Sequence, residues 1–322
     1  MIMYQSDVEG AKALVKKYDD LKKEISKVIV GQHDVIHKTI LSIFCQGHVL
    51  LVGVPGLAKT LLVNTIGQAL GLKFNRIQFT PDLMPSDIIG TEILDETRQF
   101  KFVKGPVFAN IVLADEINRT PPKTQAALLE AMQEKNVTVS GKSYRLQEPF
   151  FVLATQNPIE QEGTYPLPEA QLDRFMFNIM LDYPAYEEEI DVVKNTTGAM
   201  LGQVSPVMNA EEIVYFQQLV RRVPVADNVY EYAVRLVSRT RPHTATAHEM
   251  SNKYLSWGAG PRASQYLIIG AKGNALLKGK YSPDIEDVME IAIPILRHRV
   301  VRNYTAEAEG VTVEDIINGL ME

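Results

Sequence analysis

The stretch that most constrains the fold is a glycine-containing loop between an apolar run and a helical pattern. The apolar run His48–Val52 predicts a β-strand, and Leu61–Leu70 has the spacing of a helix that stops at Gly71. Between them stands Gly53-Val54-Pro55-Gly56-Leu57-Ala58-Lys59-Thr60. Strand, loop and helix in this order can hold a phosphate group in backbone N–H groups at a helix N-terminus.

The residue types of this loop suit a nucleoside triphosphate with magnesium. Lys59 can reach β- and γ-phosphate oxygens, and Thr60 can ligate Mg²⁺. We expect the nucleotide to contact Gly53, Pro55, Gly56, Leu57, Ala58, Lys59, Thr60 and Leu61. Alanine at a positive φ costs about 1 kcal/mol or more, so we expect a helical backbone at Ala58. An ordinary glycine turn is the alternative.

Two adjacent carboxylates follow a second apolar run. Asn110–Ala114 predicts a buried parallel strand that delivers Asp115 and Glu116 to its C-terminal edge, where ligands bind. Asp115 can hold Mg²⁺ through water, while Glu116 polarises the water that attacks the γ-phosphate. This division of roles suits hydrolysis. A solvated acidic turn is the alternative, and the glycine loop upstream weakens it.

Two more polar side chains lie near predicted strand ends. Asn157 follows the apolar run Phe150–Thr155 and could align a water against a phosphate, although an Asn-Pro pair also favours a plain turn. Arg174 joins a short helix to a last strand, predicted from Phe175 to Ile179. If it faces outward, its guanidinium could reach a nucleotide held by a neighbouring subunit.

A surface ion pair of Arg174 with Asp173 or Glu169 is the alternative to such a composite site.

Two hairpins and a helix break complete the first part of the chain. Strand-like runs at Ile88–Leu94 and Phe100–Val103 predict one hairpin, and runs on either side of 140–143 predict another. Near the N-terminus, two helical patterns are separated by Val30-Gly31-Gln32. This break offers a place for an adenine ring, and a helix–helix turn would explain it equally well.

The chain of 322 residues exceeds one small core, because domains commonly have about 150 residues. Buried strands give way to amphipathic helices after Asp182, so we expect domains at 1–182 and 183–322. Arg262 lies in the first turn of the predicted helix Pro261–Leu277 and could reach back to the γ-phosphate, although a solvated residue beside a Gly-Pro turn is also compatible. We expect a helix C-terminal charge cluster at Arg297–Arg299 and a packing role for Trp257.

Composition excludes several classes of protein. The net charge of −6 gives no general case for binding nucleic acid or an anionic membrane. The single cysteine, Cys45, excludes disulfides within the chain and favours a reducing compartment. There is no apolar run of about 18 residues and no signal-peptide pattern, so we expect a cytoplasmic protein without a membrane segment.

Five sequence blocks together resemble the MoxR branch of the AAA+ ATPases, in which alanine also stands at the position of Ala58. The blocks are Gly53-x-Pro55-Gly56-x-Ala58-Lys59-Thr60, residues 76–87, Ala114-Asp115-Glu116-Ile117-Asn118-Arg119, residues 154–158 and residues 168–175. The resemblance implies an α/β fold: an αβα sandwich with a five-stranded parallel sheet, two inserted β-hairpins and a C-terminal all-α lid domain.

The same resemblance implies roles for single residues. Asn157 would be sensor 1, Arg174 an arginine finger acting in trans, and Arg262 sensor 2. Arg119 would be a second candidate for contact between subunits, and Gln78 stands where related proteins often couple the catalytic acid to ligand binding.

For activity, the resemblance implies a Mg²⁺-dependent ATPase. It would form a homo-oligomeric ring, expected to be hexameric, and remodel a protein client with a von Willebrand factor A domain protein as partner. Two alternatives stay open. One is a nucleic-acid-stimulated motor that would use Lys142 and Arg145 of the second hairpin. The other is a scaffold that binds nucleotide and turns it over slowly.

Overall fold

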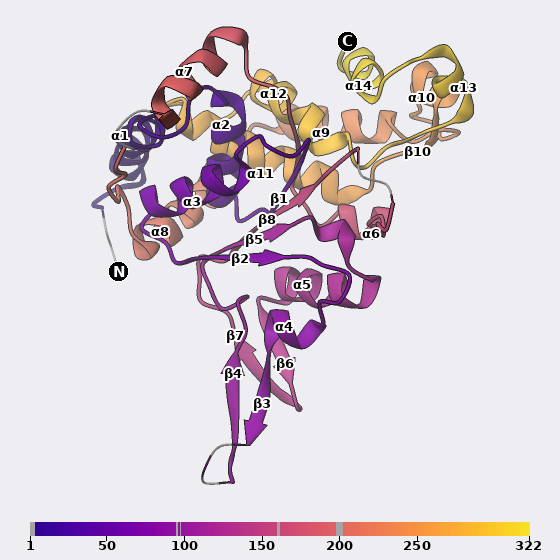
Figure 1. Ribbon diagram of the computed structural model, residues 1–322. Helices are drawn as coiled ribbons and strands as arrows, with labels where there is room; N and C mark the ends of the chain where they lie inside the picture. The colour runs from indigo at the N-terminus through magenta and orange to yellow at the C-terminus, as the bar shows by residue number, and fades with distance from the viewer. Residues whose placement is uncertain (1–3, 95, 97, 160–161, 198–201) are drawn as a thin grey trace. The chain divides into compact units, whose positions relative to one another are not determined.

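The computed structural model describes residues 4–94, 96, 98–159, 162–197 and 202–322 (Figure 1). Its internal contacts divide the chain into two units. We call Lys17–Leu167 with Ile179–Val214 the sheet unit, and residues 4–16 with Pro168–Asn178 and Tyr215–Glu322 the helical unit. The domain boundary expected at 182/183 stays a prediction.

The helices of the described residues are α1 (Asp7–Ser26), α2 (His33–Phe44), α3 (Lys59–Ala69), α4 (Pro85–Ile89), the 3₁₀ turn η1 (Ile117–Arg119), α5 (Pro122–Glu134), α6 (Glu169–Leu172), α7 (Tyr186–Thr197), α8 (Ala210–Arg222), α9 (Asp227–Arg239), α10 (Glu249–Tyr254), α11 (Pro261–Leu277), α12 (Ile285–Leu296), α13 (Tyr304–Glu309) and α14 (Val313–Met321). The strands are β1 (Val49–Gly53), β2 (Phe74–Gln78), β3 (Gly90–Leu94), β4 (Phe100–Lys104), β5 (Ile111–Asp115), β6 (Asn136–Val139), β7 (Lys142–Arg145), β8 (Phe151–Gln156), β9 (Phe177–Leu181), β10 (Leu255–Trp257) and β11 (Val301–Arg302).

A five-stranded sheet in the order β2-β5-β8-β1-β9 is the centre of the sheet unit. The pairs β2–β5, β5–β8 and β8–β1 are parallel, with Gln78 opposite Asp115 and Leu51 opposite Thr155. Helix α3 contacts β2 and β5, and the central strands are continuous buried apolar runs, as is typical of parallel strands covered on both faces. The predicted αβα fold is confirmed, and the C-terminal ends of β1, β5 and β8 meet at one edge.

Both predicted hairpins form, as β3–β4 and β6–β7. They lie side by side, because Phe102 stacks on Tyr144 with ring centroids 4.0 Å apart and Lys142 pairs with Glu92 at 3.3 Å. The strand start expected at Ile88 is wrong. Ile88 belongs to the short helix α4, which Pro85 begins and Asp87 caps by accepting the Met84 N–H at 2.8 Å.

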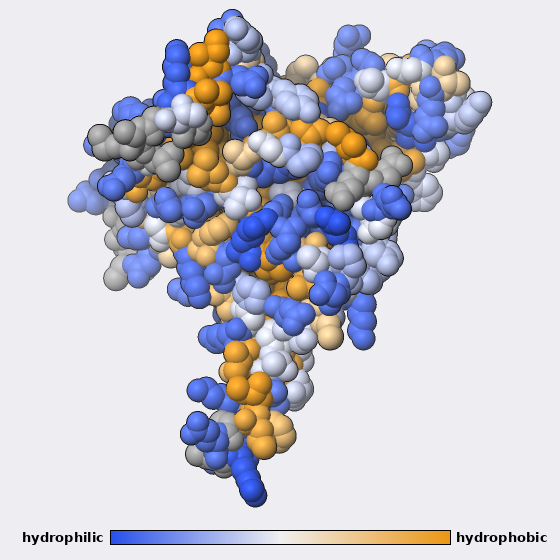
Figure 2. Space-filling model, in the orientation of Figure 1, coloured by the Kyte–Doolittle hydropathy of each residue, from blue (hydrophilic) through white to orange (hydrophobic). Residues whose placement is uncertain are grey.

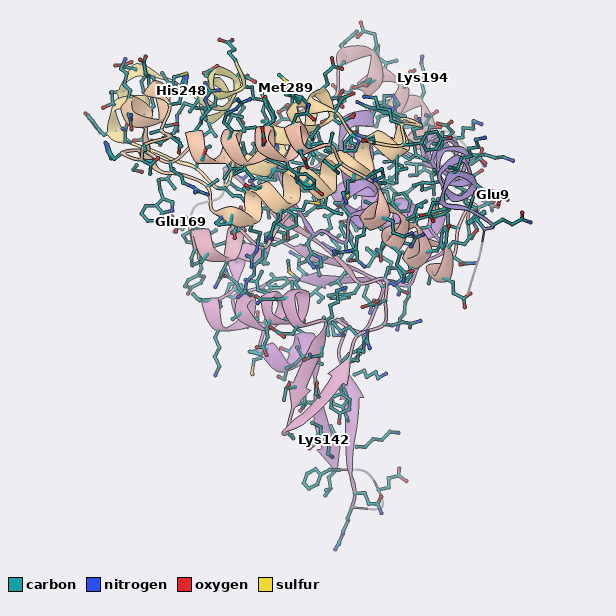
Figure 3. All side chains as sticks on the ribbon, turned by 180° about the vertical axis from the view of Figure 1, so that it is seen from behind. Glu9, Lys142, Glu169, Lys194, His248 and Met289 are labelled. Carbon is teal, nitrogen blue, oxygen red and sulfur yellow. The ribbon has the colours of Figure 1, made fainter. Side chains whose placement is uncertain are left out.

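The β3–β4 hairpin carries an apolar surface. Figure 2 shows hydrophobic side chains gathered along it, and Figure 3 shows Lys142 on the neighbouring hairpin. The exposed apolar side chains of the hairpin are Ile93, Leu94, Phe100 and Val103. In the register of the hairpin, Leu94 and Phe100 are paired on one face, while Ile93 and Val103 lie on the other. Exposed apolar side chains gathered on one element are typical of a surface that contacts another molecule.

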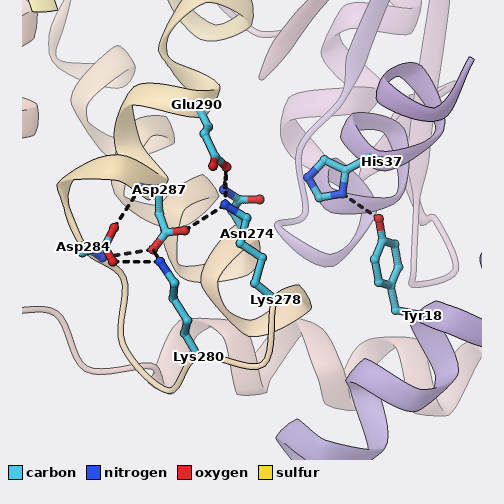
Figure 4. A network of polar contacts seen from close by, with 8 residues as sticks. All are labelled: Tyr18, His37, Asn274, Lys278, Lys280, Asp284, Asp287 and Glu290. Carbon is cyan, nitrogen blue, oxygen red and sulfur yellow. Dashed lines mark hydrogen bonds and ion pairs between the residues drawn. The ribbon is translucent and has the colours of Figure 1, made fainter.

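The helical unit confirms α11 at its predicted bounds, and α12 begins after Asp284, whose carboxylate caps it by accepting the Asp287 N–H at 3.1 Å. The buried Asp287 carboxylate accepts from Lys278 at 3.4 Å and from Lys280 at 3.1 Å, so its charge is compensated (Figure 4). Helix α12 ends at Leu296, and β11 then pairs antiparallel with β10.

None of the described helices combines the length and the apolar character that crossing a membrane requires.

Candidate nucleotide site

The predicted phosphate-binding and acidic residues line one cavity of about 430 Å³ in the sheet unit. Its lining residues are Pro55, Gly56, Leu57, Ala58, Lys59, Thr60, Leu61, Asp115, Glu116, Thr155 and Asn157. They meet because the loop, the acids and the asparagine each follow one of the strands β1, β5 and β8, whose C-terminal ends are adjacent. Gly53 and the segment 30–32 do not line this cavity.

The glycine loop contains a strained alanine. Ala58 has φ 52° and ψ 28°, which is left-handed, so the expectation of a helical backbone there is wrong. The physical reason is that Ala58 is the N-cap residue: α3 begins at Lys59, and the Ala58 carbonyl accepts the Leu62 N–H at 2.9 Å. This conformation costs an alanine about 1–2 kcal/mol, and such strain is concentrated at functional sites.

The Lys59 ammonium folds back into the loop and donates to the Gly53 carbonyl. Burial lowers the pKa of Lys59, and the Asp115 and Glu116 carboxylates act in the opposite direction. A half-buried cation therefore faces the two acids across the cavity. The ammonium can donate charge-assisted hydrogen bonds to an anion that enters the cavity.

The Asp115 carboxylate has two partners on neighbouring strands. Oδ1 accepts the Thr155 hydroxyl at 2.6 Å, and Oδ2 accepts from Arg76 Nε at 3.0 Å and Nη2 at 2.6 Å. Thr155 Oγ1 also accepts the Glu116 N–H at 2.8 Å. Sequence reasoning gave Thr155 and Arg76 no role. The one signal in the sequence was that both lie in the family-like blocks 76–87 and 154–158.

The Glu116 side chain is also held. Glu116 itself has a left-handed backbone at φ 57°, and its Oε2 accepts from Gln78 Nε2 at 3.0 Å and from Arg119 Nη1 at 3.2 Å. The structure thus brings Gln78 and Arg119 to the predicted catalytic acid. Asn157 lines the cavity as predicted, and its Oδ1 accepts the Ile159 N–H at 3.1 Å.

The expected adenine segment lies beside the glycine loop. Gln32 is the N-cap of α2 at φ 52°, and its Nε2 donates to the Leu57 carbonyl at 3.5 Å. Its Oε1 is buried and has no hydrogen-bond partner in the described part of the chain, so it fits a ligand that donates a hydrogen bond, such as an amino group on a base. Gly31 has φ 65°, and a Cβ there would lie 2.4 Å from the Glu188 carboxylate.

The oxygen atoms in this cavity suit Mg²⁺, which needs few protein ligands, better than a metal that is held entirely by side chains. Thr60 and Asp115, the two predicted ligands, line the same cavity with oxygen donors. Mg²⁺ prefers oxygen and keeps several waters, so it needs few protein ligands. Within the described ranges, no group of three or more His, Cys, Asp or Glu side chains is placed to hold a metal.

In the helical unit, two arginines hold Asp173, the neighbour of Arg174. Arg262 Nη1 lies 2.9 Å from Asp173 Oδ2, and Arg299 Nε donates to Oδ1 at 2.7 Å. The side chain of Arg299 is 2% exposed, and burial lowers its pKa while Asp173 opposes this. Residues 297–299 follow the end of α12 at Leu296, and Arg299 Nη1 donates to the Ile295 carbonyl in the last turn, as expected of cations at a helix C-terminus; what the sequence did not predict is the burial of Arg299.

Arg174 follows α6, and its carbonyl accepts the Tyr266 hydroxyl at 3.2 Å. The strand after it begins at Phe177, because Asp173 to Phe175 form a turn, so the predicted start at Phe175 is wrong. Asp173, the suggested surface partner of Arg174, pairs with Arg262 and Arg299 instead. The finger and sensor roles of Arg174 and Arg262 stay predictions.

Trp257 is 69% exposed and lines a second cavity of about 620 Å³ within the helical unit, together with Glu169, Asp173 and Arg299. Figure 3 labels Glu169 on α6. The expectation that Trp257 is a packing residue is therefore wrong.

Comparison with known proteins identifies the family. The profile of the family described as "ATPase family associated with various cellular activities (AAA)" matches residues 48–177, and that of the "AAA lid domain" matches residues 247–320. Chaperone MoxR1 of Mycobacterium tuberculosis is 41% identical over 317 residues, which cover 97% of this chain and 84% of that protein. YeaC of Bacillus subtilis is 42% identical and covers 93% of this chain and 91% of its own length.

A crystal structure of a protein from Cytophaga hutchinsonii superposes with a TM-score of 0.91 at 43% identity, covering 97% of this chain and 96% of that one. The fold, the two matched profiles and relatives above 40% identity over nearly the whole chain agree with one another. This chain belongs to the MoxR branch of the AAA+ ATPases.

Proposed function

We propose that this chain is a Mg²⁺-dependent ATP hydrolase that works in an oligomeric ring to remodel or assemble a protein partner. The observation that carries the proposal is the convergence of Lys59, Asp115, Glu116 and Asn157 on one cavity. A cation, two carboxylates and an amide around one space are the groups that hydrolysis of a triphosphate requires.

In this proposal each side chain has a separate task. Lys59 binds the β- and γ-phosphates of ATP, and Glu116 polarises the attacking water, which Asn157 helps to align. Thr60 and Asp115 hold Mg²⁺, which supplies charge neutralisation on the phosphates when it is bound. The unpartnered Gln32 Oε1 supports an adenine position next to Leu57.

The ring is proposed from the family. AAA+ proteins act as rings, and we propose a hexamer in which Arg174 reaches the nucleotide of a neighbouring subunit while Arg262 senses it. A relative named as a chaperone supports a protein client, and a von Willebrand factor A domain protein is the proposed partner. The expected location is the cytoplasm.

The hairpins favour a protein client over nucleic acid. Ile93, Leu94, Phe100 and Val103 give β3–β4 an apolar surface, which suits contact with protein. On the neighbouring hairpin, the two cations that would grip phosphates already have acidic partners, since Lys142 pairs with Glu92 and Arg145 with Glu148. A nucleic-acid motor would instead show ATPase activity that DNA stimulates and that salt strongly reduces.

Glu116→Gln tests the hydrolysis proposal. We expect this variant to bind ATP with nearly wild-type affinity and to release phosphate at least about 100-fold more slowly, because the carboxylate that activates water is gone. Glu130→Gln on the exposed face of α5 is the matched control and should keep the wild-type rate. A slow nucleotide-binding scaffold predicts a low wild-type rate that Glu116→Gln scarcely changes.

Mixing variants tests the ring. Arg174→Ala and Lys59→Ala chains should each be inactive and should regain part of the activity when mixed, because an intact finger from one chain then faces an intact loop in another. No recovery in mixed rings of verified composition would reject the finger assignment. Activity per chain should also rise with protein concentration as rings form.

A further inference from the structure

Arg76 connects the two acids of the candidate site. Its guanidinium donates to Asp115 Oδ2 through both Nε, at 3.0 Å, and Nη2, at 2.6 Å. The same Nη2 donates to Gln78 Oε1. Gln78 Nε2 in turn donates to Glu116 Oε2 at 3.0 Å. A continuous chain of hydrogen bonds therefore runs from Asp115 through Arg76 and Gln78 to Glu116.

Arg76 also sets the orientation of the Gln78 amide. An amide has an acceptor end and a donor end, and only one orientation satisfies both neighbours. Because the guanidinium can only donate, it holds Oε1, and the donor end must then face Glu116. Without Arg76 nothing in this chain of contacts would hold Oε1, and the amide could rotate away from Glu116.

The strand geometry makes this connection specific. Arg76 and Gln78 are two residues apart on β2, so their side chains share one face, and Gln78 lies opposite Asp115 in the parallel register. Arg76 is 45% exposed and Asp115 is 14% exposed, so the link joins a largely covered acid to a side chain that solvent and ions can reach. The strand β2 lies at the edge of the sheet.

We propose that Arg76 is a positioning residue that couples the charge state around Asp115 to the restraint on Glu116. This inference rests on the proposed function. The Arg76 guanidinium and Mg²⁺ compete for the negative charge of Asp115, so Arg76 lowers the affinity of the site for the metal. When Arg76 gives up Asp115, it also gives up Gln78 Oε1, and the Gln78 amide no longer holds Glu116.

Metal binding tests the first half of the proposal. In the Glu116→Gln background, which removes hydrolysis, we would titrate Mg²⁺ and follow the binding of a fluorescent ATP analogue. Arg76→Gln should lower the half-saturating Mg²⁺ concentration about fivefold, which corresponds to about 1 kcal/mol for an ion pair of this exposure. Arg145→Gln, whose side chain is 81% exposed and pairs at 3.6 Å, is the matched control and should change nothing.

The rate tests the second half. In the otherwise wild-type chain, Arg76→Gln should raise the basal kcat, and in a Gln78→Ala background it should add no further change, because the bond from Gln78 to Glu116, through which Arg76 acts, is already absent while that from Arg119 is kept in both backgrounds. Arg76→Lys keeps the charge beside Asp115 but lacks the planar fork, in which the bond from Nε to Asp115 fixes Nη2 against Gln78 Oε1. It should therefore keep the wild-type Mg²⁺ dependence and show the raised kcat.

An unchanged or higher half-saturating Mg²⁺ concentration in Arg76→Gln would overturn the proposal, and so would equal effects on kcat in the two Gln78 backgrounds. A merely structural arginine predicts weaker metal binding and a lower kcat, which is the opposite direction. If the Glu116→Gln chain binds no nucleotide at any Mg²⁺ concentration, the proposed function itself fails, and that outcome is distinct from a failure of the Arg76 inference.

Discussion

Replacing Arg299 by methionine removes a buried guanidinium that holds the segment around Arg174. Arg299 donates to the carboxylate of Asp173 and to the backbone carbonyls of Asp173 at 2.8 Å, Phe175 at 2.6 Å and Ile295. Methionine has a similar length but no donor. The substitution therefore takes a donor from each of these acceptors and from the Met176 carbonyl, to which Arg299 Nη1 also donates at 3.4 Å, while the Phe175 carbonyl keeps His298 Nε2 as a partner at 3.1 Å.

The expected loss follows from these contacts. Each buried acceptor left without a donor costs about 1–3 kcal/mol, and breaking a buried charged pair by removing one partner costs about 3–5 kcal/mol. The terms are not additive, because Arg262 still pairs with Asp173 and water can enter beside the exposed Trp257. We expect Arg299→Met to lower the free energy of unfolding by about 3–5 kcal/mol.

Urea unfolding measures this loss. The single tryptophan, Trp257, lies in the helical unit and lines a cavity with Arg299, so its fluorescence reports on the affected region. Arg235→Met is the matched control, because the Arg235 side chain is exposed and its Cζ lies over the Tyr232 ring, 5.8 Å from the ring centroid. The loss of unfolding free energy in Arg299→Lys should lie between the losses in Arg299→Met and in the control, since one ammonium cannot satisfy all the acceptors. A difference of less than about 0.5 kcal/mol between Arg299→Met and the control would refute this reasoning.

Two further predictions concern the free energy of unfolding, one for a substitution at Ala58 and one for a change of pH. Ala58→Gly should raise the free energy of unfolding by about 1 kcal/mol in urea unfolding, because glycine adopts φ 52° without the strain that alanine bears; a loss of stability would contradict this. The pKa of His48 is lowered to about 4, chiefly by burial, and its Nδ1 accepts the Val152 N–H at 3.0 Å. The unfolded imidazole takes a proton below its ordinary pKa of 6.5 and the folded one only near 4, so stability is lost as pH falls through this window. From pH 7 to pH 5 the wild type should lose about 2 kcal/mol more than His48→Gln, and equal losses would show that His48 does not titrate in this way.

The sequence was sufficient for the main parts of the fold and of the site. The cores of β1, β5 and β8 are apolar runs, because strands of a parallel sheet that is covered on both faces must be apolar on both sides. The glycine loop, the two acids and Asn157 stand at the C-terminal ends of these runs. Their order along the chain was therefore enough to predict one shared cavity. The bounds of α11 could be predicted because Gly260-Pro261 begins the helix and its apolar spacing is regular.

The contacts between distant segments could not be predicted in this way. The bonds of Thr155 and Arg76 to Asp115 depend on which strands pair and in which register, and no local pattern states this. The burial of Arg299 could not be predicted, because it depends on contacts with residues 173–176, which are distant in the sequence. The helix expectation at Ala58 followed the usual cost of φ > 0, which this loop bears.

The central claim is that three strand ends build one site for ATP around Lys59. Equilibrium binding of labelled ATP with Mg²⁺ to the wild type, to Lys59→Ala and to Lys73→Ala tests it directly. Lys73 immediately precedes β2 and so lies at the N-terminal ends of the strands, whereas the cavity lies at their C-terminal ends. Its ammonium donates to the Phe108 carbonyl at 3.1 Å. We predict that Lys59→Ala weakens ATP binding at least about 100-fold, from the loss of charge-assisted bonds worth about 3 kcal/mol, while Lys73→Ala binds as the wild type does. Equal affinity of Lys59→Ala and the wild type would contradict the account.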